Sequence, residues 1–392
     1  MKKTLIALAT LAACGATFAQ SSVTISGLID IGYGSVNGPA NALGVQTGDI
    51  SRVAQNGSGT TAIVIGGVED LGKGLKALFR YEMNPDFVGG SGLTGGAGAT
   101  SGAGATAIGA AANGYHFVGV EGGFGKVLFG RLNTGSLAAW GAGSTFGTAL
   151  GSGYGANGNI YTRYSSPTGN YFNTAPTRMN GSVEYTTPVM GGLSARLLYA
   201  PEANYAGLGT DTACASSACA AAGPATSIGS NRAGVSDISV AFSAGKFNAV
   251  AARQKVKVGV NAMSALASPT GAATGTNQLT TVGANYDLGF ATVRGGFWTE
   301  TVVTTVDTAG RQLGLSIPMG AITLHASVAT SNDRTAANVD KKIMGLGADY
   351  ALSKRSNVYG RYENRDANSN SAADTSAAGS TKTMHVGVRH TF

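Results

Sequence analysis

The sequence lacks any apolar run long enough to cross a membrane as a helix. Over 392 residues the longest near-continuous apolar run is 5–13, far short of the roughly 20 residues that a spanning helix needs. Charged residues are also scarce, at 12% against 43% hydrophobic residues, a balance that excludes an intrinsically disordered chain. The 61 glycines follow no three-residue period, which excludes collagen, and no long stretch shows helical periodicity. A large all-β protein is the class that remains.

The first twenty residues have the features of a bacterial export signal. A basic start at 1–3 precedes the apolar run 5–13, and 16–19 (ATFA) place small residues at positions −1 and −3 of a cleavage site. We therefore expect a signal peptide over 1–19 and a mature barrel domain over 20–392.

Cysteine is scarce, with three residues in the chain. Cys14 ends the segment 11–14 (LAAC), which resembles a lipoprotein signal, so a lipid-modified N-terminus at Cys14 is the alternative. Ordinary cleavage is favoured because a predicted strand starts at Val23 and needs no tether. In the oxidising compartment that export implies, we expect Cys214 and Cys219 to form a small structural disulfide. Their surroundings do not suggest a metal site, and the glycine pairs lack phosphate-loop spacing, so no metal and no cofactor are expected.

The dominant pattern after residue 20 is an alternation of apolar and polar residues over about ten positions, followed by a turn. A period of two places the two sets on opposite faces of a β-strand. The polar faces carry too much charge for a packed sandwich core. A polar interior with an apolar exterior is the pattern of a transmembrane barrel, and lipid requires that its sheet be closed. Clear examples are 75–82, 182–185, 237–242, 322–328 and 384–392.

Turn signals give the number of strands. Seven short turns alternate with eight longer polar stretches, which predicts sixteen antiparallel strands with both termini at the short-turn end. The short turns are 69–74, 121–125, 189–192, 244–246, 287–289, 318–320 and 353–356. The longer stretches are 34–50, 86–113, 132–177, 200–234, 259–278, 301–311, 330–341 and 365–381.

The longest of these stretches, 132–177, is rich in aromatic residues, among them Trp140 and Tyr154. It contains no acidic residue, and Arg163 is its one formal charge. An exposed loop with so many aromatic residues would be unusual unless it packs on something. We expect it to fold back into the barrel as a constriction loop; the alternative is that its aromatic residues cover the outer mouth.

Four segments, in order along the mature chain, resemble those of a known family. Residues 20–30 (QSSVTISGLID) resemble the opening strand of Gram-negative trimeric porins, beta-proteobacterial branch, and 69–77 (EDLGKGLKA) their first short turn. Residues 122–131 (GGFGKVLFGR) resemble the second turn and the strand that leads to the constriction loop. Residues 387–392 (GVRHTF) resemble the C-terminal strand, whose final Phe is an assembly signal.

The resemblance implies a sixteen-stranded outer-membrane barrel that assembles as a homotrimer. It implies passive diffusion of small hydrophilic solutes and ions through each monomer, with outer-membrane lipid and lipopolysaccharide around it, and a third external loop folded inward. The sequence departs from the family where selectivity is set. Basic residues that the family usually carries correspond to Ala62, Gly114 and Glu184, and the acidic motif of the inward loop is absent.

Alternation predicts which charged residues line the pore. Basic residues outnumber acidic ones in this set, which predicts a mild anion preference. The alternative is that the charges pair across neighbouring strands and only keep the wall wet. The predicted basic residues are Lys76, Arg80, Arg178, Arg196, Arg253, Lys255, Lys257, Arg294, Arg361 and Arg389, and the acidic ones are Glu82, Glu184, Asp237, Asp287, Asp349 and Glu363.

Two further predictions concern positions off the lumen. Arg131 shares its face with Phe129, which predicts a bulge, or a contact at the loop or subunit interface, at this point. Aromatic residues near strand ends on the apolar face are expected to form interfacial girdles. They are Tyr33, Tyr81, Tyr185, Tyr199, Tyr286, Tyr350 and Phe392.

Other functions fit less well. Of the four histidines, His390 is expected to face lipid, and His325 and His385 stand alone on their strands, so an enzyme is not expected. The formal charge of +7 comes without a long basic run, which argues against a nucleic-acid partner. The alternative function is an adhesin or structural barrel with an incidental pore, whose partner would bind the loops 86–113 and 200–234.

Overall fold

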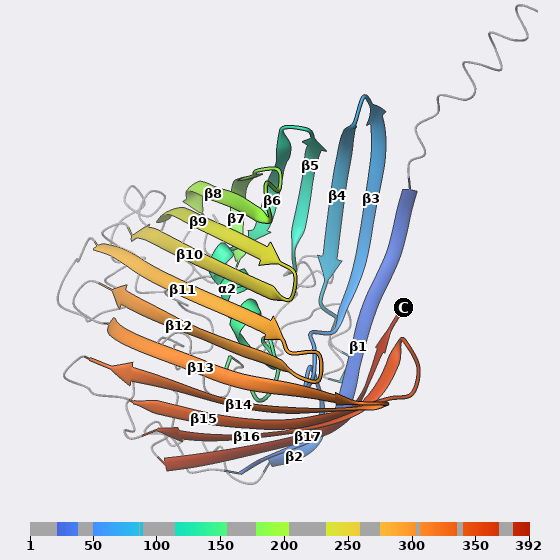
Figure 1. Cartoon of the computed structure of the whole chain (residues 1–392), viewed down its shortest axis with the longest axis vertical. Helices are drawn as coiled ribbons and strands as arrows, with labels where there is room; N and C mark the ends of the chain where they lie inside the picture. Colours follow the sequence, from blue (N-terminus) through green and yellow to red (C-terminus); the bar gives the residue numbers. More distant parts are fainter. Residues whose placement is uncertain are drawn as a thin grey trace, which may run out of the picture.

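The computed structural model is a closed antiparallel β-barrel with a helix inside it (Figure 1). The pairing of β1 (Ser22–Asn37) with β17 (Gly379–Thr391) closes the wall. The expected signal peptide 1–19, Arg163, Cys214 and Cys219 lie outside the described residues. The structure describes residues 22–37, 50–85, 87–88, 114–154, 178–203, 233–258, 275–302, 306–334, 340–367 and 379–392.

The other strands follow one another around the wall in chain order. They are β2 (Ile50–Gln55), β3 (Ala62–Gly72), β4 (Leu75–Met83), β5 (His116–Gly122), β6 (Gly125–Asn133), β7 (Arg178–Thr186), β8 (Leu193–Ala203), β9 (Ala233–Ala244), β10 (Phe247–Val258), β11 (Gly275–Asp287), β12 (Thr292–Val302), β13 (Val306–Met319), β14 (Ile322–Asp333), β15 (Lys341–Ala351) and β16 (Ser356–Ala367). The helix α2 (Gly135–Gly143) lies between β6 and β7 in the chain.

Within the described residues, these strands occupy sixteen positions in the wall, as the turn pattern predicts. Both β2 and β3 pair with β1, so together they form the second position. All seven predicted short turns join neighbouring strands. The stretch 301–311 was expected to be a long polar connection, and this is wrong. There β12 continues to Val302 and β13 starts at Val306, so strand covers most of it.

Apolar side chains cover the outside of the barrel, as the alternation predicts. Val23 is 67% exposed and Val386 is 59% exposed, whereas the inward-facing Asp30 is fully buried. Residues directly opposite each other on paired strands share a face, so the register extends this assignment around the wall. Within the described part of the chain, no helix is long and apolar enough to span a membrane.

The second wall position is interrupted by a segment that points inward. Gln55 pairs with Ile31 and Ala62 pairs with Leu28, so the six residues 56–61 face only two residues of β1. The surplus of four residues leaves the sheet, and the backbone carbonyl of Gly57 accepts a hydrogen bond of 3.3 Å from the N–H of Leu150, in the constriction loop. We call 56–61 the inward bulge; no local pattern in the sequence predicts it.

The inward bulge is held by Asp30, a carboxylate buried in the wall of β1. Asp30 accepts hydrogen bonds from the backbone N–H of Ser58 at 2.6 Å and of Gly59 at 2.7 Å. The hydroxyl of Tyr359 donates to the other carboxylate oxygen. Asn56 begins the bulge with a φ of 70°, a left-handed conformation that asparagine tolerates better than most residues. A buried acidic residue on one strand thus fixes the break in its neighbour.

Candidate functional site: the pore constriction

The constriction loop is anchored at the start of α2. The side chain of Thr134 caps the helix by accepting from the N–H of Leu137. The carboxylate of Asp237, fully buried on β9, accepts from the N–H of Gly135 at 2.9 Å and from the N–H of Ser136 at 3.4 Å. A negative charge at a helix N-terminus is favoured by the exposed N–H groups and the helix dipole. Asp237 therefore serves the loop and not the passage.

A second carboxylate anchors the other end of the described loop. Glu363 on β16 accepts from the N–H of Gly151 at 2.8 Å and of Gly153 at 3.2 Å. The hydroxyl of Ser327 donates to the carbonyl of Gly151 at 2.8 Å. Opposite this point the wall residue is Gly345, where an added Cβ would collide with Gly151. The loop can thus lie directly against the wall.

Aromatic residues hold the middle of the loop. Trp140 is fully buried, and its ring centroid lies 5.2 Å from that of Trp298 on β12 and 5.5 Å from that of Tyr154. The indole N–H of Trp140 donates to the carbonyl of Gly147 at 2.8 Å. The predicted infolding is therefore confirmed for the described residues 134–154. Trp140 fixes the loop and does not touch the passage.

The inner wall carries a first cluster of charges on β4, β7 and β8, next to the Asp237 anchor on β9. Arg80 pairs with Glu82 at 2.7 Å, and Arg178 lies 3.9 Å from the same carboxylate. Arg196 pairs with Glu184 at 2.5 Å. The predicted pore-lining residues of these strands therefore face the lumen as ion pairs.

Tyr115 lies among these charges, just before β5. Burial, reinforced by the charge of Glu184, raises the pKa of its phenol to about 12. The guanidinium of Arg80 lies 5.8 Å from the centre of the Tyr115 ring. The phenol is therefore neutral at physiological pH, and it adds no negative charge to the cluster.

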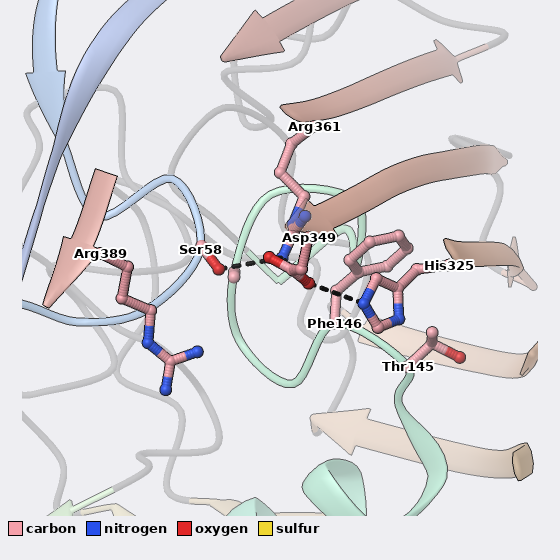
Figure 2. A pocket seen from close by; sticks show the side chains of 8 residues that line it. Ser58, Thr145, Phe146, His325, Asp349, Arg361 and Arg389 are labelled. Carbon is pink, nitrogen blue, oxygen red and sulfur yellow. Dashed lines mark hydrogen bonds and ion pairs between the residues drawn. The ribbon is translucent and has the colours of Figure 1, made fainter. Parts of the chain in front are cut away.

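A second cluster lies where the inward bulge meets β14, β15 and β16 (Figure 2). Arg361 donates to Asp349 at 2.9 Å and to the hydroxyl of Ser58 at 2.9 Å. Its guanidinium also lies 5.5 Å from the ring centre of Phe146, in the constriction loop. The residues enclose a cavity of about 210 Å³ to which Arg389 also contributes. The bulge and the loop thus meet at one charged point of the lumen.

His325 is not isolated on its strand, and that prediction is wrong. Its Nε2 lies 2.7 Å from Asp349, and its Nδ1 lies 3.0 Å from the hydroxyl of Ser316. His385 is also partnered, with its Nδ1 3.0 Å from the hydroxyl of Tyr359. These contacts join neighbouring strands of the wall, so the alternation within a single strand gives no sign of them.

Two arginines of the lumen stand apart from the ion pairs. Among the described residues, Arg294 and Arg389 have no acidic partner within ion-pair distance. Arg294 donates to the hydroxyl of Ser316 at 3.2 Å, and Arg389 lies apart from the Arg361 group in Figure 2. The described part of the constriction loop, 134–154, contains no charged residue. Three inward-facing carboxylates of the described residues, Asp30, Asp237 and Glu363, also lack a basic partner, but backbone N–H groups bind each of them.

The prediction that Arg253 and Lys255 line the pore is wrong. Arg253 pairs in register with Ile238, which is 57% exposed on the outer face, while the neighbouring Gln254 is buried opposite Asp237. Arg253 and Lys255 are exposed on that outer face. Lys257 belongs to the same strand, and its side chain lies outside the described part.

The reason for this error is the constriction loop. The helix α2 packs on the inner faces of β10 and β11 (Figure 1), and the inner face of β10 is uncharged there, with Val250, Ala252 and the buried Gln254. Near the long-loop end, the outer face is the polar one. On this strand the polar residues of the alternation therefore face outward, opposite to the pattern expected for the barrel. Alternation alone thus assigns Arg253 and Lys255 to the wrong face.

The remaining predicted positions are placed as follows. Lys76 lies on the inner face of β4, opposite Asp70 and Glu121 in the register. Arg131 lies at an irregularity in the pairing of β6 with β7, between Gly130 and Leu132, and it donates to the carbonyl of Gly114 at 3.2 Å. A bulge at this point is one of the two predicted explanations for the face of Arg131, the other being a contact at the loop or subunit interface.

Comparison with known proteins places this barrel. The family model described as Gram-negative porin matches residues 4–371. The chain belongs to the Gram-negative porin family. It is therefore an outer-membrane protein of the channel-forming type, built on the barrel described above.

Individual porins are similar to the whole chain or to about half of it. The outer membrane porin protein 32 of Delftia acidovorans is 29% identical over 427 aligned positions that cover 100% of both chains. The major outer membrane protein P.IB of Neisseria lactamica is 32% identical over 52% of this chain and 51% of its own. The sequence of the chain is thus similar to outer-membrane proteins from two genera.

Solved structures agree on the fold. A structure described as an anion-selective porin from Comamonas acidovorans superposes with a TM-score of 0.70 at 23% identity, covering 95% of this chain and 100% of its own. OmpT of Vibrio cholerae, described as a trimer form, superposes with a TM-score of 0.59 at 16% identity, covering 95% and 99%. At these identities the likeness establishes the porin architecture.

Proposed function

We propose that this porin is a passive diffusion channel for small hydrophilic solutes and ions, with a mild preference for anions. The observation that carries the preference is the pair of lumen arginines without acidic partners among the described residues, Arg294 and Arg389, beside a loop segment free of charge. Charges that line a low-dielectric channel change the local ion concentration within a Debye length of about 8–10 Å. Unpaired arginines therefore enrich anions in the narrow part of the lumen.

The ion pairs limit the size of this preference. Arg80, Arg196 and Arg361 each have a carboxylate within 3 Å, so their fields largely cancel at a distance. Paired charges still keep the wall of the lumen hydrated. The alternative prediction assigns this role to all of the charged residues predicted to line the pore. The preference thus depends on a few positions, and it is expected to be mild. The similarity to an anion-selective porin supports its sign.

The maturation, orientation and assembly of the channel are part of this proposal. We propose cleavage after Ala19, an extracellular location for the long-loop end of the barrel and a homotrimer in the membrane. Both described termini, at Ser22 and Phe392, lie at the short-turn end, which would then face the periplasm. The description of the similar OmpT structure as a trimer form supports the assembly.

The test of the proposed function is conductance in a planar bilayer. Purified mature protein is expected to give steady ohmic steps, and a salt gradient is expected to give a reversal potential of the sign that anion permeation produces. A cation-favouring potential would contradict the charge assignment. Silence in the bilayer, with the protein folded, would favour the adhesin alternative.

Hydrolysis is the other function to test, because His325 is hydrogen-bonded to Ser316 on one side and to Asp349 on the other. A serine, a histidine and a carboxylate in such a chain are the groups that a serine hydrolase uses. We propose that they form a structural chain and not a catalytic one. Asp349 is also bound by Arg361 and by the Asn357 amide, at 2.9 Å each, and the hydroxyl of Ser316 accepts from Arg294.

We expect no ester hydrolysis above buffer and no fluorophosphonate labelling of the purified channel, because the Ser316 hydroxyl is occupied at the wall. Ser316→Ala is the matched control and is expected to behave identically in both assays. Labelling that disappears in the Ser316→Ala variant would show a reactive serine and would contradict the structural role.

A further inference from the structure

The inward bulge begins with an asparagine–glycine pair that the structure requires. Asn56 has a φ of 70°, in the left-handed region, where asparagine and glycine are tolerated best. At Gly57 an added Cβ would lie 2.3 Å from Nδ1 of His385 and 2.6 Å from the hydroxyl oxygen of Tyr359, so no side chain fits there. Two separate constraints, one on backbone conformation and one on space, therefore place these two residue types side by side.

An asparagine followed by glycine is chemically able to lose its side-chain amide without an enzyme. The backbone nitrogen of the glycine attacks Cγ of the asparagine and a succinimide ring closes. The side-chain nitrogen then leaves as ammonia, which takes up the proton of the attacking nitrogen by way of water. A water molecule opens the ring at either carbonyl, which gives aspartate or isoaspartate. Because the attack is intramolecular, its rate depends on how the structure holds the two groups.

Both reacting groups are prepared in the inward bulge. Among the described residues, the N–H of Gly57 donates no hydrogen bond, although Asp30 binds the N–H groups of the two residues that follow it. The nitrogen of Gly57 thus attacks without first losing a hydrogen bond. Oδ1 of Asn56 accepts from the N–H of Thr61 at 2.7 Å, which polarises the amide carbonyl and stabilises the negative charge that develops on this oxygen during the attack.

Water reaches the amide of Asn56 from the lumen. The preceding residue, Gln55, pairs with Ile31, whose neighbour Asp30 is the one that faces inward. Asn56 therefore lies on the inner side of the wall, and it is exposed. The lumen supplies the water that opens the ring and takes away the ammonia.

The same tripeptide, Asn-Gly-Ser, occurs again at 180–182 in β7, where the structure holds it differently. Arg131 donates to Oδ1 of Asn180, so a polarised carbonyl is present at both sites. Asn180 is only half-exposed, however, and the hydroxyl of Ser182 donates to the carbonyl of Met179 at 3.0 Å, which ties the chain across the pair. A difference in rate between the two sites therefore measures the effect of the structure alone.

We propose that Asn56 is a site of spontaneous deamidation in the folded porin, and that the reaction places a carboxylate on the inward bulge. The bulge contacts Arg361 through the hydroxyl of Ser58, at 2.9 Å. It also lies beside Arg389, whose Nε would be 3.8 Å from a Cβ added at Gly59. A negative charge on this bulge offsets the lumen arginines and lowers the anion preference. This effect on selectivity rests on the proposed function, whereas the modification does not.

The test follows both sites by mass spectrometry of tryptic peptides. The purified full-length mature porin is incubated at neutral pH, folded in detergent or unfolded in guanidinium chloride. Trypsin gives the peptides 53–73 and 179–196, each with a single asparagine, and deamidation raises the mass of a peptide by about 1 Da. In the folded channel 53–73 is expected to convert about tenfold faster than 179–196, and at least as fast as in the unfolded chain, where both peptides should convert alike.

Two results would overturn the proposal. Conversion of 53–73 at the same rate as 179–196 in the folded channel would show that the inward bulge has no special reactivity. Conversion of 53–73 more slowly in the folded channel than in the unfolded chain would show that the bulge protects its amide.

Reversal potentials separate the modification from the proposed function. Asn56→Asp introduces the charge directly and is expected to lower the anion-to-cation permeability ratio about twofold, and the incubated unmutated porin is expected to drift toward that value. The matched control is Asn56→Gly, which tolerates the φ of 70° and has no amide to lose, so its potential is expected to stay constant during incubation.

Conversion at Asn56 without any drift would overturn the effect on selectivity and leave the modification site in place. A cation preference in freshly purified, unconverted porin would contradict the proposed function and leave the modification site untouched. Drift in the Asn56→Gly variant equal to that of the unmutated porin would assign the change in potential to another position.

Discussion

Replacing Arg294 and Arg389 by glutamate is expected to turn the channel from weakly anion-selective to cation-selective. Each substitution changes the lumen charge by two units, and a unit charge about 9 Å from an ion in water is worth roughly 0.5 kcal/mol before screening. Together they should lower the anion-to-cation permeability ratio by about tenfold. The measurement is the reversal potential across a salt gradient in a planar bilayer, and its sign is expected to change.

The control applies the same charge change to the outside of the barrel. Arg253→Glu/Lys255→Glu alters the net charge by the same four units, but on the outward face of β10. We expect its reversal potential to equal that of the unmutated channel. If the outer pair shifted the potential as strongly as Arg294→Glu/Arg389→Glu, the assignment of faces around β10 would be wrong.

Deleting residues 57–60 is expected to widen the channel. The register requires the loss of four residues for β2 and β3 to become one continuous strand, with Asn56 opposite Asp30 and Ala62 still opposite Leu28. The deletion removes a backbone excursion about two strands wide, roughly 10 Å, from the lumen. Single-channel conductance is therefore expected to rise, and larger uncharged solutes are expected to permeate in liposome swelling.

The matched variant for this deletion is Ser58→Ala. It removes the hydroxyl that Arg361 binds but keeps the inward bulge and its hydrogen bonds to Asp30. Its conductance is expected to stay close to that of the unmutated porin. A deletion variant that folds and conducts like the Ser58→Ala variant would show that the constriction loop alone limits the passage.

The arrangement of the pore constriction could be predicted from the sequence only in part. The infolding of the loop follows from its aromatic residues, since Trp140 needs a partner, but the sequence does not name Trp298 as that partner. The inward bulge depends on Asp30, more than twenty residues earlier in the chain, and on Tyr359, which lies two strands away in the wall and some three hundred residues later in the chain. The pairing of His325 with Asp349 likewise depends on the register of two strands.

The sequence by itself determined the class, the sixteen wall positions, the outward face of most strands and the inward loop. These follow from local rules: alternation with a period of two, turn chemistry and the composition of one segment. The tertiary structure alone decided which charges are paired and where the second wall position is interrupted. It also decided on which face of β10 the charged side chains lie. At β10, α2 packs against the inner wall and the charged Arg253 and Lys255 lie on the outer face, so contact between distant segments overrides the local pattern.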